Sequence, residues 1–464
     1  MKRFSFLFIL TLITVSINAQ SLFIDSILYE GNTKTKNYII RRELNFKEND
    51  TISLAGLTQK FNQNRSRILN TGLFKDVYLN IKSWNTESNH ISILIKVQEA
   101  WYIYPIPIFE LADRNFNVWW DQFNGSLKRV NLGIKFIHSN LTGQADALKI
   151  TLQGGYSTKI DLEYSWPFWG LNRNWRFTSK IFYAQNKESY FNTVENQLAF
   201  YKSADDDYSL HRMRFNTGLE NRISLQLFQR LELEYSSNKT SNEISKVLNP
   251  DFFLNNKASQ NFLSLKYQIR YDDRDLKYYP GTGHLAELNI IKEGLGNEKD
   301  LNTLYTNITL QQFIPWSKKH NAGIMIRAKG SIIRDQIPYY NSRALGYGEN
   351  YLKGYEYYVV DGLDYFFLKF RERFVFYDKK VTLFPKSKFG IKSKPVKLGI
   401  SAHASTGYVN NVYYSENNSF GNRWLYSSGL SLECLLSNTS FIQLDWSVNH
   451  LKQSGFFLHF KDDF

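Results

Sequence analysis

The sequence predicts a mainly β protein, in which a small α+β domain of order βααββ precedes a 16-stranded antiparallel transmembrane β-barrel. Aromatic side chains make up 16% of the 464 residues, while the mean hydropathy is −0.40. A membrane barrel combines these properties because only alternate residues face lipid and aromatic girdles line both membrane interfaces. From residue 101 onward, segments of about 10 to 14 residues alternate in polarity, as barrel strands do.

Residues 1–20 are typical of a signal peptide. Two basic residues precede an apolar run from Phe4 to Ile17, and Asn18-Ala19-Gln20 follow it. The run is short for a helix that spans a membrane, which disfavours the alternative of an N-terminal anchor. We therefore expect export with cleavage near Ala19. No later stretch approaches 18 apolar residues, so the exported chain is expected to be periplasmic, secreted or a barrel.

Residues 21–99 are predicted to form the small domain. The first strand stops at the turn pair Gly31-Asn32, and Gly72 ends the second helix. Thr35 and Ser53 are expected to cap the two helices. The three strands are predicted at Leu22–Tyr29, Phe74–Ile81 and His90–Val97.

Residues 100–464 are predicted to form the barrel, beginning near Trp101. We find about 17 candidate strands, and because bacterial barrels have even strand numbers, one candidate is assigned to a loop. The weakest candidate is Tyr190–Tyr201, which a run of three aspartates follows. A soluble β-sandwich or propeller is disfavoured, because turn signals are too few and no second sheet would cover the apolar face.

The composition argues against several classes of function. Cys434 is the only cysteine, which excludes an intramolecular disulfide and a cysteine-rich metal site. The eight histidines lack metal-ligand spacing, and no Gly-x-Ser-x-Gly sequence occurs. We expect no enzymatic activity, no metal and no cofactor. The net charge of +14 does not indicate nucleic acid, because an exported barrel does not meet it routinely; lipopolysaccharide phosphates are the expected anionic neighbours.

Short motifs occur in both predicted domains. Those of the small domain are Gly31-Asn32, Thr35, Ile40, Arg42, Gly72-Leu73-Phe74, Val77 and Val97-Gln98-Glu99. Those of the barrel are Tyr164-Ser165-Trp166-Pro167, Tyr271–Asp275, Pro280-Gly281, Gly283 and Leu352-Lys353-Gly354-Tyr355. In this order and spacing they resemble the POTRA module and barrel of the outer-membrane assembly and translocation superfamily, which includes BamA, TamA and the two-partner secretion transporters. The resemblance covers nearly the whole mature chain.

The resemblance implies that Lys353, Gly354 and Tyr355 form the tip of a long loop that folds back into the barrel lumen. Lys353 replaces the family's arginine and so offers a point charge in place of a bidentate fork. Ser405 stands where many members carry the aspartate that receives the arginine. Alternation places Glu433 and Asp445 in the lumen, so these carboxylates and Ser405 are the candidate partners of the loop. By the same alternation along the strand, the side chains of Lys369, Arg371 and Arg373 are expected to face the lumen.

The first and last strands are expected to meet at a seam. The segment Trp101–Phe109 is predicted to be the first barrel strand. Pro105 and Pro107 are two residues apart in it, so the two missing N–H donors lie on the same side of the strand. If that side faces the last strand, which carries Phe460 and Phe464, the seam opens more easily. The alternative is that both prolines lie in a linker. The alternating aromatics of the last strand resemble the C-terminal signal of outer-membrane barrels.

The leading functional prediction is a barrel that assists the insertion or translocation of proteins at the outer membrane. Clients would add a strand to the POTRA sheet edge and pass through the lateral seam; a spacer role for the POTRA domain is the alternative. A dedicated two-partner-type secretion transporter and a passive pore are the competing functions. The expected partners are unfolded outer-membrane or exported proteins, lipid and lipopolysaccharide, and periplasmic accessory proteins. The expected location is the outer membrane of a Gram-negative bacterium, with the POTRA domain in the periplasm.

Overall fold

The computed structural model describes residues 21–170, 174–203, 208–296, 300–381, 394–437 and 440–460. The predicted signal peptide lies outside the described residues. The chain divides into two compact units, Met1–Ala100 and Trp101–Phe464. Within the described ranges, no helix is long and apolar enough to cross a membrane.

The first unit is an α+β domain with one sheet. Its elements are β1 (Ser21–Glu30), α1 (Asn37–Arg41), β2 (Thr51–Ser53), α2 (Leu57–Asn70), β3 (Phe74–Asn85) and β4 (His90–Glu99). The strands pair in the order β2-β1-β4-β3, with β1 and β4 parallel. The three predicted strands and two helices are confirmed, and the structure adds β2. A strand of three residues is too short to show an alternating pattern, which is why the sequence did not reveal it.

Both helices begin after residues other than the predicted caps. The residue before α1 is Lys36, which makes no side-chain cap, and Thr35 one position earlier donates its backbone N–H to Oε1 of Glu99 at 2.6 Å. Ser53 is the last residue of β2, and α2 begins only after Gly56, which makes no side-chain cap. The predicted end of α2 is correct, because Gly72 adopts a positive φ of 72° directly after the helix.

Glu99 closes the loop that follows β1. Its carboxylate accepts hydrogen bonds from the Thr33 hydroxyl at 2.8 Å and from the backbone N–H groups of Lys34 and Thr35. Gly31 begins this loop with φ of 90°, and a Cβ atom there would lie 2.0 Å from the carbonyl oxygen of Val97. Close contact with β4 therefore requires glycine at this position.

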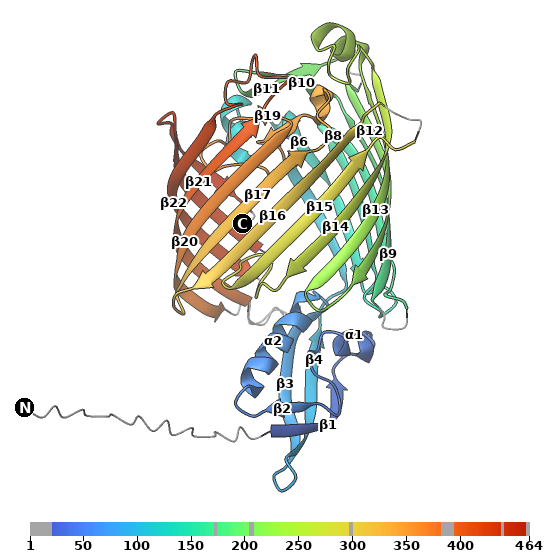
Figure 1. Ribbon diagram of the computed structural model, residues 1–464, viewed down its shortest axis with the longest axis vertical. Coiled ribbons are helices and arrows are strands. Elements are labelled where there is room, and N and C mark those ends of the chain that lie inside the picture. The colour runs from blue at the N-terminus through green and yellow to red at the C-terminus, as the bar shows by residue number, and fades with distance from the viewer. Residues whose placement is uncertain are drawn as a thin grey trace, which may run out of the picture. The chain divides into compact units, whose positions relative to one another are not determined.

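The second unit contains a 16-stranded antiparallel sheet that curves round as a barrel of tilted strands (Figure 1). The predicted strand number is confirmed. In spatial order the strands are β5 (Ile103–Leu111), β6 (Val130–Ser139), β7 (Ala147–Gly155), β8 (Ser157–Ser165), β9 (Trp175–Asn186), β12 (Leu210–Arg222), β13 (Leu227–Thr240), β14 (Ser259–Asp272), β15 (Gly283–Glu293), β16 (Thr303–Pro315), β17 (His320–Ser331), β20 (Asp364–Val381), β21 (Lys394–Asn410), β22 (Trp424–Ser437), β23 (Ser440–Asn449) and β24 (Ser454–His459).

The weakest strand candidate, Tyr190–Tyr201, forms a hairpin that is not part of the barrel wall. Strands β10 (Glu188–Val194) and β11 (Gln197–Lys202) pair only with each other, as a separate two-stranded sheet. The hairpin joins β9 to β12 at the end of the barrel opposite to the start of β5. We call this end distal and the end at which β5 begins proximal.

An apolar cluster, which we call the distal cap, forms where the distal connections meet. It includes the hairpin, the π-helical turn η3 (Ile244–Leu248) and the 3₁₀ turn η4 (Tyr339–Asn341). Its side chains come from Leu210, Ile244, Phe252, Phe253, Tyr339 and Tyr340, with Tyr190, Phe191, Tyr201, Leu248 and Tyr414 packed against them. Apolar side chains from the distal connections therefore form one cluster at this end of the barrel.

The two faces of the barrel wall differ as the alternating pattern requires. On β22, Leu430 and Leu432 are 59% and 53% exposed, whereas Ser431 and Glu433 between and beside them are buried. The exposed leucines form the outer face, where lipid replaces water. The buried polar side chains face the lumen, which is therefore hydrophilic.

Candidate functional site: the lumen loop and the seam

The lumen loop, residues 346–359, connects the short paired strands β18 (Arg343–Leu345) and β19 (Val360–Asp361). Its backbone makes a turn from Leu352 to Tyr355, in which the N–H of Tyr355 donates to the carbonyl of Leu352 at 3.1 Å. Gly354 has φ of 82°, and a Cβ atom there would lie 3.4 Å from the Cβ of Ser427. The tip of the loop therefore lies in van der Waals contact with the inner wall of the barrel, and its positive φ favours glycine at this position.

Lys353 lies inside the lumen next to β23. Its ammonium group is 3.2 Å from Oδ1 of Asp445 and 3.4 Å from the hydroxyl of Ser431. Lys353 is 2% exposed and Asp445 is fully buried. The Nε2 group of Gln443 donates a further hydrogen bond of 2.7 Å to Asp445. Among the predicted lumen partners, the structure thus brings Asp445 to Lys353.

The other two candidate partners bond elsewhere on the wall. The carboxylate of Glu433 lies 2.5 Å from Nε of Arg373 and accepts a hydrogen bond of 2.6 Å from Ser401. The hydroxyl of Ser405 lies 2.8 Å from that of Ser427. Arg373, together with Lys369 and Arg371, is buried at lumen positions of β20, as its parity predicted.

Tyr355 and Gly354 bond to β22 and β23. The hydroxyl of Tyr355 donates to the carbonyl of Tyr426 at 3.0 Å and lies 2.5 Å from Nδ1 of His450. The side chain of Asn449 donates to the carbonyl of Gly354 at 2.9 Å. The three motif residues therefore bond to neighbouring strands near the C-terminal end of the sheet.

The lumen loop also contacts the last strand. Oε1 of the buried Glu356 is 3.4 Å from Nε2 of His459, and the same nitrogen is 3.3 Å from Oδ2 of Asp445. These are ion-pair distances without hydrogen-bond alignment. The ring of Tyr351 stacks on His459 with a centroid separation of 5.3 Å. The sequence analysis identified neither Glu356 nor His459 as a site residue.

The connection between β5 and β6 also forms hydrogen bonds with the lumen loop. The guanidinium of Arg114 donates to the carbonyls of Tyr357 and Tyr358 at 3.0 and 2.8 Å. The side chain of Asn115 donates to the carbonyl of Glu356 at 2.7 Å. Nothing in the local sequence identifies these residues, because their partners lie more than 240 positions away.

The prolines of β5 lie on its free edge. The N–H of Ser139 donates to the carbonyl of Tyr102, and that of Ala112 to the carbonyl of Arg129, both at 2.8 Å. In the register of β5 with β6, even-numbered residues of β5 therefore bond to β6. The backbone nitrogens of Pro105 and Pro107, at odd positions, point away from β6.

The opposite end of the sheet is β24. It pairs with β23 over six residues, whereas β5 and β6 pair over nine. Within the described ranges, the sheet runs from β24 to β5 without a pairing that joins the two end strands. Asn117 donates instead from its side chain to the carbonyl of Phe456 at 2.6 Å. Phe460 follows the end of β24 and is exposed, and Phe464 lies outside the described residues.

Two family models match non-overlapping parts of the sequence. The Omp85 superfamily domain matches residues 140–364, and the POTRA model, described as a surface antigen variable number repeat, matches residues 23–100. This chain belongs to the Omp85 superfamily. The BamA/TamA-like resemblance is thereby confirmed, and the chain is an outer-membrane barrel whose general role is the insertion or secretion of proteins.

Solved structures with the same fold include two outer-membrane barrels. BamA from Haemophilus ducreyi lacking POTRA domains 1–3 has a TM-score of 0.54 and 15% identity, covering 95% of this chain and 83% of that one. CdiB from Escherichia coli has a TM-score of 0.58 and 11% identity, covering 95% of this chain and 75% of that one. A comparison with curated proteins finds no match. At these identities the likeness establishes the Omp85 fold alone.

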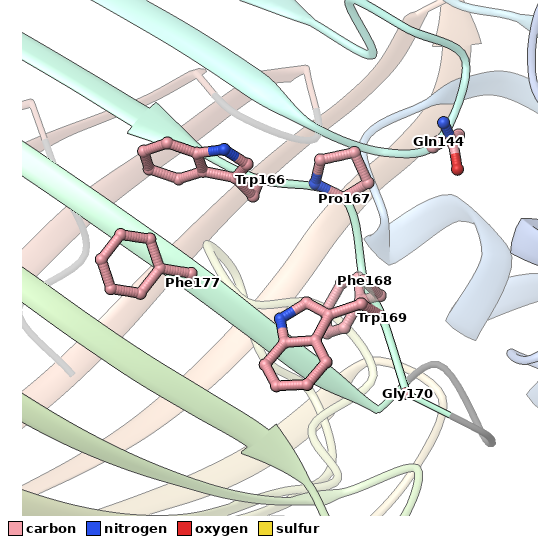
Figure 2. Close-up of a pocket in the computed structure, with 7 residues that line it drawn as sticks. All are labelled: Gln144, Trp166, Pro167, Phe168, Trp169, Gly170 and Phe177. Carbon is pink, nitrogen blue, oxygen red and sulfur yellow. The ribbon is translucent and has the colours of Figure 1, made fainter.

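An aromatic pocket lies at the proximal rim of the Omp85 barrel, apart from the lumen loop. Figure 2 shows Trp166, Phe168 and Trp169 along the connection from β8 to β9, with Phe177 across from Trp166. The rings of Trp166 and Phe177 are 5.0 Å apart, and the pocket has a volume of about 820 Å³. Such aromatic side chains are typical of the girdle at a membrane interface. Across the described ranges, no group of three or more His, Cys, Asp or Glu side chains could hold a metal ion.

Proposed function

We propose that this Omp85 barrel assists the insertion or translocation of proteins at the outer membrane, and that clients pass through a lateral seam between β5 and β24. The observation that carries the proposal is the free edge of β5, on which Pro105 and Pro107 provide no N–H donors. The proposal places the POTRA domain in the periplasm. Lipid, lipopolysaccharide and periplasmic accessory proteins are its further proposed partners.

The missing donors lower the free energy needed to part the seam. A backbone hydrogen bond contributes about 1 kcal/mol net in water and more in lipid, where no solvent replaces it. Relative to a seam with N–H donors at both positions, the two missing donors therefore lower the free energy of opening by roughly 2 to 4 kcal/mol. Because about 1.4 kcal/mol is a factor of ten, the population of an open seam rises by one to three orders of magnitude.

The POTRA sheet offers an edge at which a client strand can be recruited. The order β2-β1-β4-β3 leaves two edge strands, of which β2 has three residues and β3 has twelve. Tyr78 and Trp84 on β3 are exposed aromatic side chains. An extended client that adds to β3 would gain main-chain hydrogen bonds whatever its sequence, which suits a receptor for many unfolded proteins.

The distal cap disfavours the passive pore. A pore needs an open mouth, whereas the distal end carries an apolar cluster to which four connections contribute. The dedicated two-partner-type transporter is the second candidate, because the chain also shares its fold with CdiB over 95% of its length. Depletion in cells separates the two, since loss of many outer-membrane proteins indicates a general factor and loss of one exported protein indicates a dedicated one.

A reversible cross-link tests the seam. In a Cys434→Ser background, cysteines replace Asn117 and Ser454 and are joined by a short, cleavable thiol reagent. We expect the linked protein to remain folded but to lose insertion or secretion activity, which cleavage of the linker restores. A matched control links Ile134 and Leu152, which are opposed residues on β6 and β7 and need not separate. Full activity of the linked seam variant would refute the proposal.

A further inference from the structure

The tip of the β10–β11 hairpin is a tight turn with one buried residue. Val194 pairs with Gln197, so the turn consists of Glu195 and Asn196, whose φ values of 50° and 63° are both positive. Two-residue turns of this kind favour asparagine, because asparagine tolerates the left-handed region. Glu195 is exposed, as is usual at a loop tip, whereas Asn196 is only 7% exposed. The hairpin therefore places Asn196 against other parts of the barrel.

All four polar atoms of Asn196 form hydrogen bonds with segments outside the hairpin. Its backbone N–H donates to the carbonyl of Asn417 at 3.2 Å, and its carbonyl accepts from the N–H of Val359 at 2.8 Å. Its Nδ2 donates to the hydroxyl of Ser419 at 3.0 Å, and its Oδ1 accepts from the N–H of Phe420 at 3.0 Å. Asn196 thus joins the hairpin to the connection between β21 and β22 and to the last residue of the lumen loop.

The hairpin also contacts the start of the lumen loop. The ring of Tyr190 lies 6.4 Å from that of Tyr347, between centroids. The hydroxyl of Tyr347 donates to Asp361 of β19 at 2.6 Å, and the side chain of Asn418 donates to the other oxygen of Asp361 at 3.0 Å. Both ends of the loop are therefore held near the hairpin at the distal end, where Figure 1 shows β10, β11 and β19.

We propose that the β10–β11 hairpin is a latch on the lumen loop, in which Asn196 is the positioning residue. The tip of the loop bonds to the barrel wall at Lys353 and Tyr355, whereas its last residue bonds to the hairpin. A large displacement of the tip requires the backbone at the ends of the loop to change conformation, and the bond from Val359 to Asn196 opposes that change. Release of the latch and displacement of the loop therefore favour each other, because coupling between two sites is reciprocal.

Only the consequence of the latch rests on the proposed function. Tyr357 packs on Phe457 with ring centroids 5.7 Å apart, and Tyr358 donates to Gln453 at 2.8 Å, so the loop supports the strand that borders the seam. The latch would then control the seam from the distal surface. An uncoupled hairpin would leave the result of the seam cross-link unchanged, and full activity of the cross-linked seam would leave the latch intact. The two proposals can therefore fail separately.

Hydrogen exchange of the full-length protein in lipid nanodiscs tests the coupling without a client protein. Asn196→Gly keeps a residue that adopts a positive φ but removes both side-chain hydrogen bonds. Protection of the Val359 N–H should fall about tenfold or more. The N–H groups of Tyr355 and Tyr358 bond within the loop and should lose protection by a similar factor. Ser419→Ala removes one of the same two bonds from the opposite side, and it should lower protection about threefold to tenfold.

Glu195→Gly is the matched control. It places glycine at the other position of the same turn, where the exposed side chain forms no hydrogen bond with the described residues, and it should leave protection of the loop unchanged. Lys353→Met provides the reverse test, because freeing the loop tip should also lower protection of the Asn196 N–H.

A merely local role of Asn196 would lower protection at Val359 and Phe420 alone. The proposal is overturned by that result, or by unchanged protection of the loop in Asn196→Gly. It is also overturned if Lys353→Met lowers protection at Tyr355 without lowering it at Asn196.

Discussion

Replacing Lys353 by methionine should free the lumen loop from the barrel wall. Methionine keeps most of the side-chain volume but leaves Asp445, which is fully buried, without its nearest cation. Removal of one partner of a buried ion pair usually costs about 3 to 5 kcal/mol. Because Gln443 and His459 still face Asp445, we expect a value near 3 kcal/mol, which shifts the balance toward a displaced loop on the order of a hundredfold.

Hydrogen exchange of the loop measures this shift directly. The backbone N–H groups of Tyr355 and Tyr358 donate to carbonyls within the loop, at 3.1 and 2.9 Å, and are protected while the loop is folded. Their protection factors should fall about a hundredfold in Lys353→Met. Lys149→Met is the matched control. Lys149 forms a half-exposed pair with Glu163 at 2.7 Å, whose loss should cost less than about 1 kcal/mol.

A double variant separates the stranded charge from lost packing. In Lys353→Met with Asp445→Asn, no unpaired carboxylate remains at this position, so more than half of the lost protection should return. Unchanged protection in Lys353→Met would refute the reasoning, because it would mean that the ion pair does not hold the loop. An additive loss in the double variant would contradict the assignment of the effect to the buried charge.

Three further outcomes are expected. Burial raises the pKa of Glu99, but hydrogen bonds from Thr35, Thr33 and Lys34 outweigh it and hold the pKa below its usual 4.5. The POTRA domain therefore has stability that is present above that pH and is lost as the pH falls through the lowered pKa; acid unfolding of Glu99→Gln should lack this component. Gly31→Ala should destabilise the same domain by at least about 2 kcal/mol in denaturant unfolding, whereas Gly72→Ala, with open space for its Cβ, should cost about 1 kcal/mol. Deleting the β10–β11 hairpin should raise single-channel conductance in planar bilayers, because it removes part of the distal cap.

The sequence predicted the fold well because barrel strands follow a two-residue period. Each lumen position had to be polar and each lipid position apolar, so alternation located the strands and their faces. Because bacterial barrels have even strand numbers, one candidate had to be a loop, and the weakest candidate, Tyr190–Tyr201, forms a separate hairpin in the structure. Features too short to show several repeats of this period were not predicted. The strand β2 has only three residues, and α1 begins after Lys36, one position later than a cap at Thr35 requires.

The candidate site was predictable by face but not by position around the barrel. Parity placed Glu433 and Asp445 in the lumen, and both are there, yet the sequence could not tell which one meets Lys353. That choice depends on how far the loop reaches round the wall, which is set by its contacts with Arg114 and Asn115 from the first connection. These contacts depend on the three-dimensional path of two irregular segments, which no periodicity describes.

In the proposed mechanism, the first connection, the lumen loop and the last strand together determine what opening of the seam costs. Asn117 supplies the side-chain hydrogen bond to the free edge of β24, at Phe456, and Asn115 beside it bonds the loop at Glu356. A client strand that pairs with β24 would replace the bond from Asn117 by one from its own backbone, which is a nearly neutral exchange. The main cost of entry therefore lies in moving the lumen loop away from β24, where Glu356 meets His459. On this argument the insertion rate should respond more strongly to changes in the loop contacts than to the loss of Asn117.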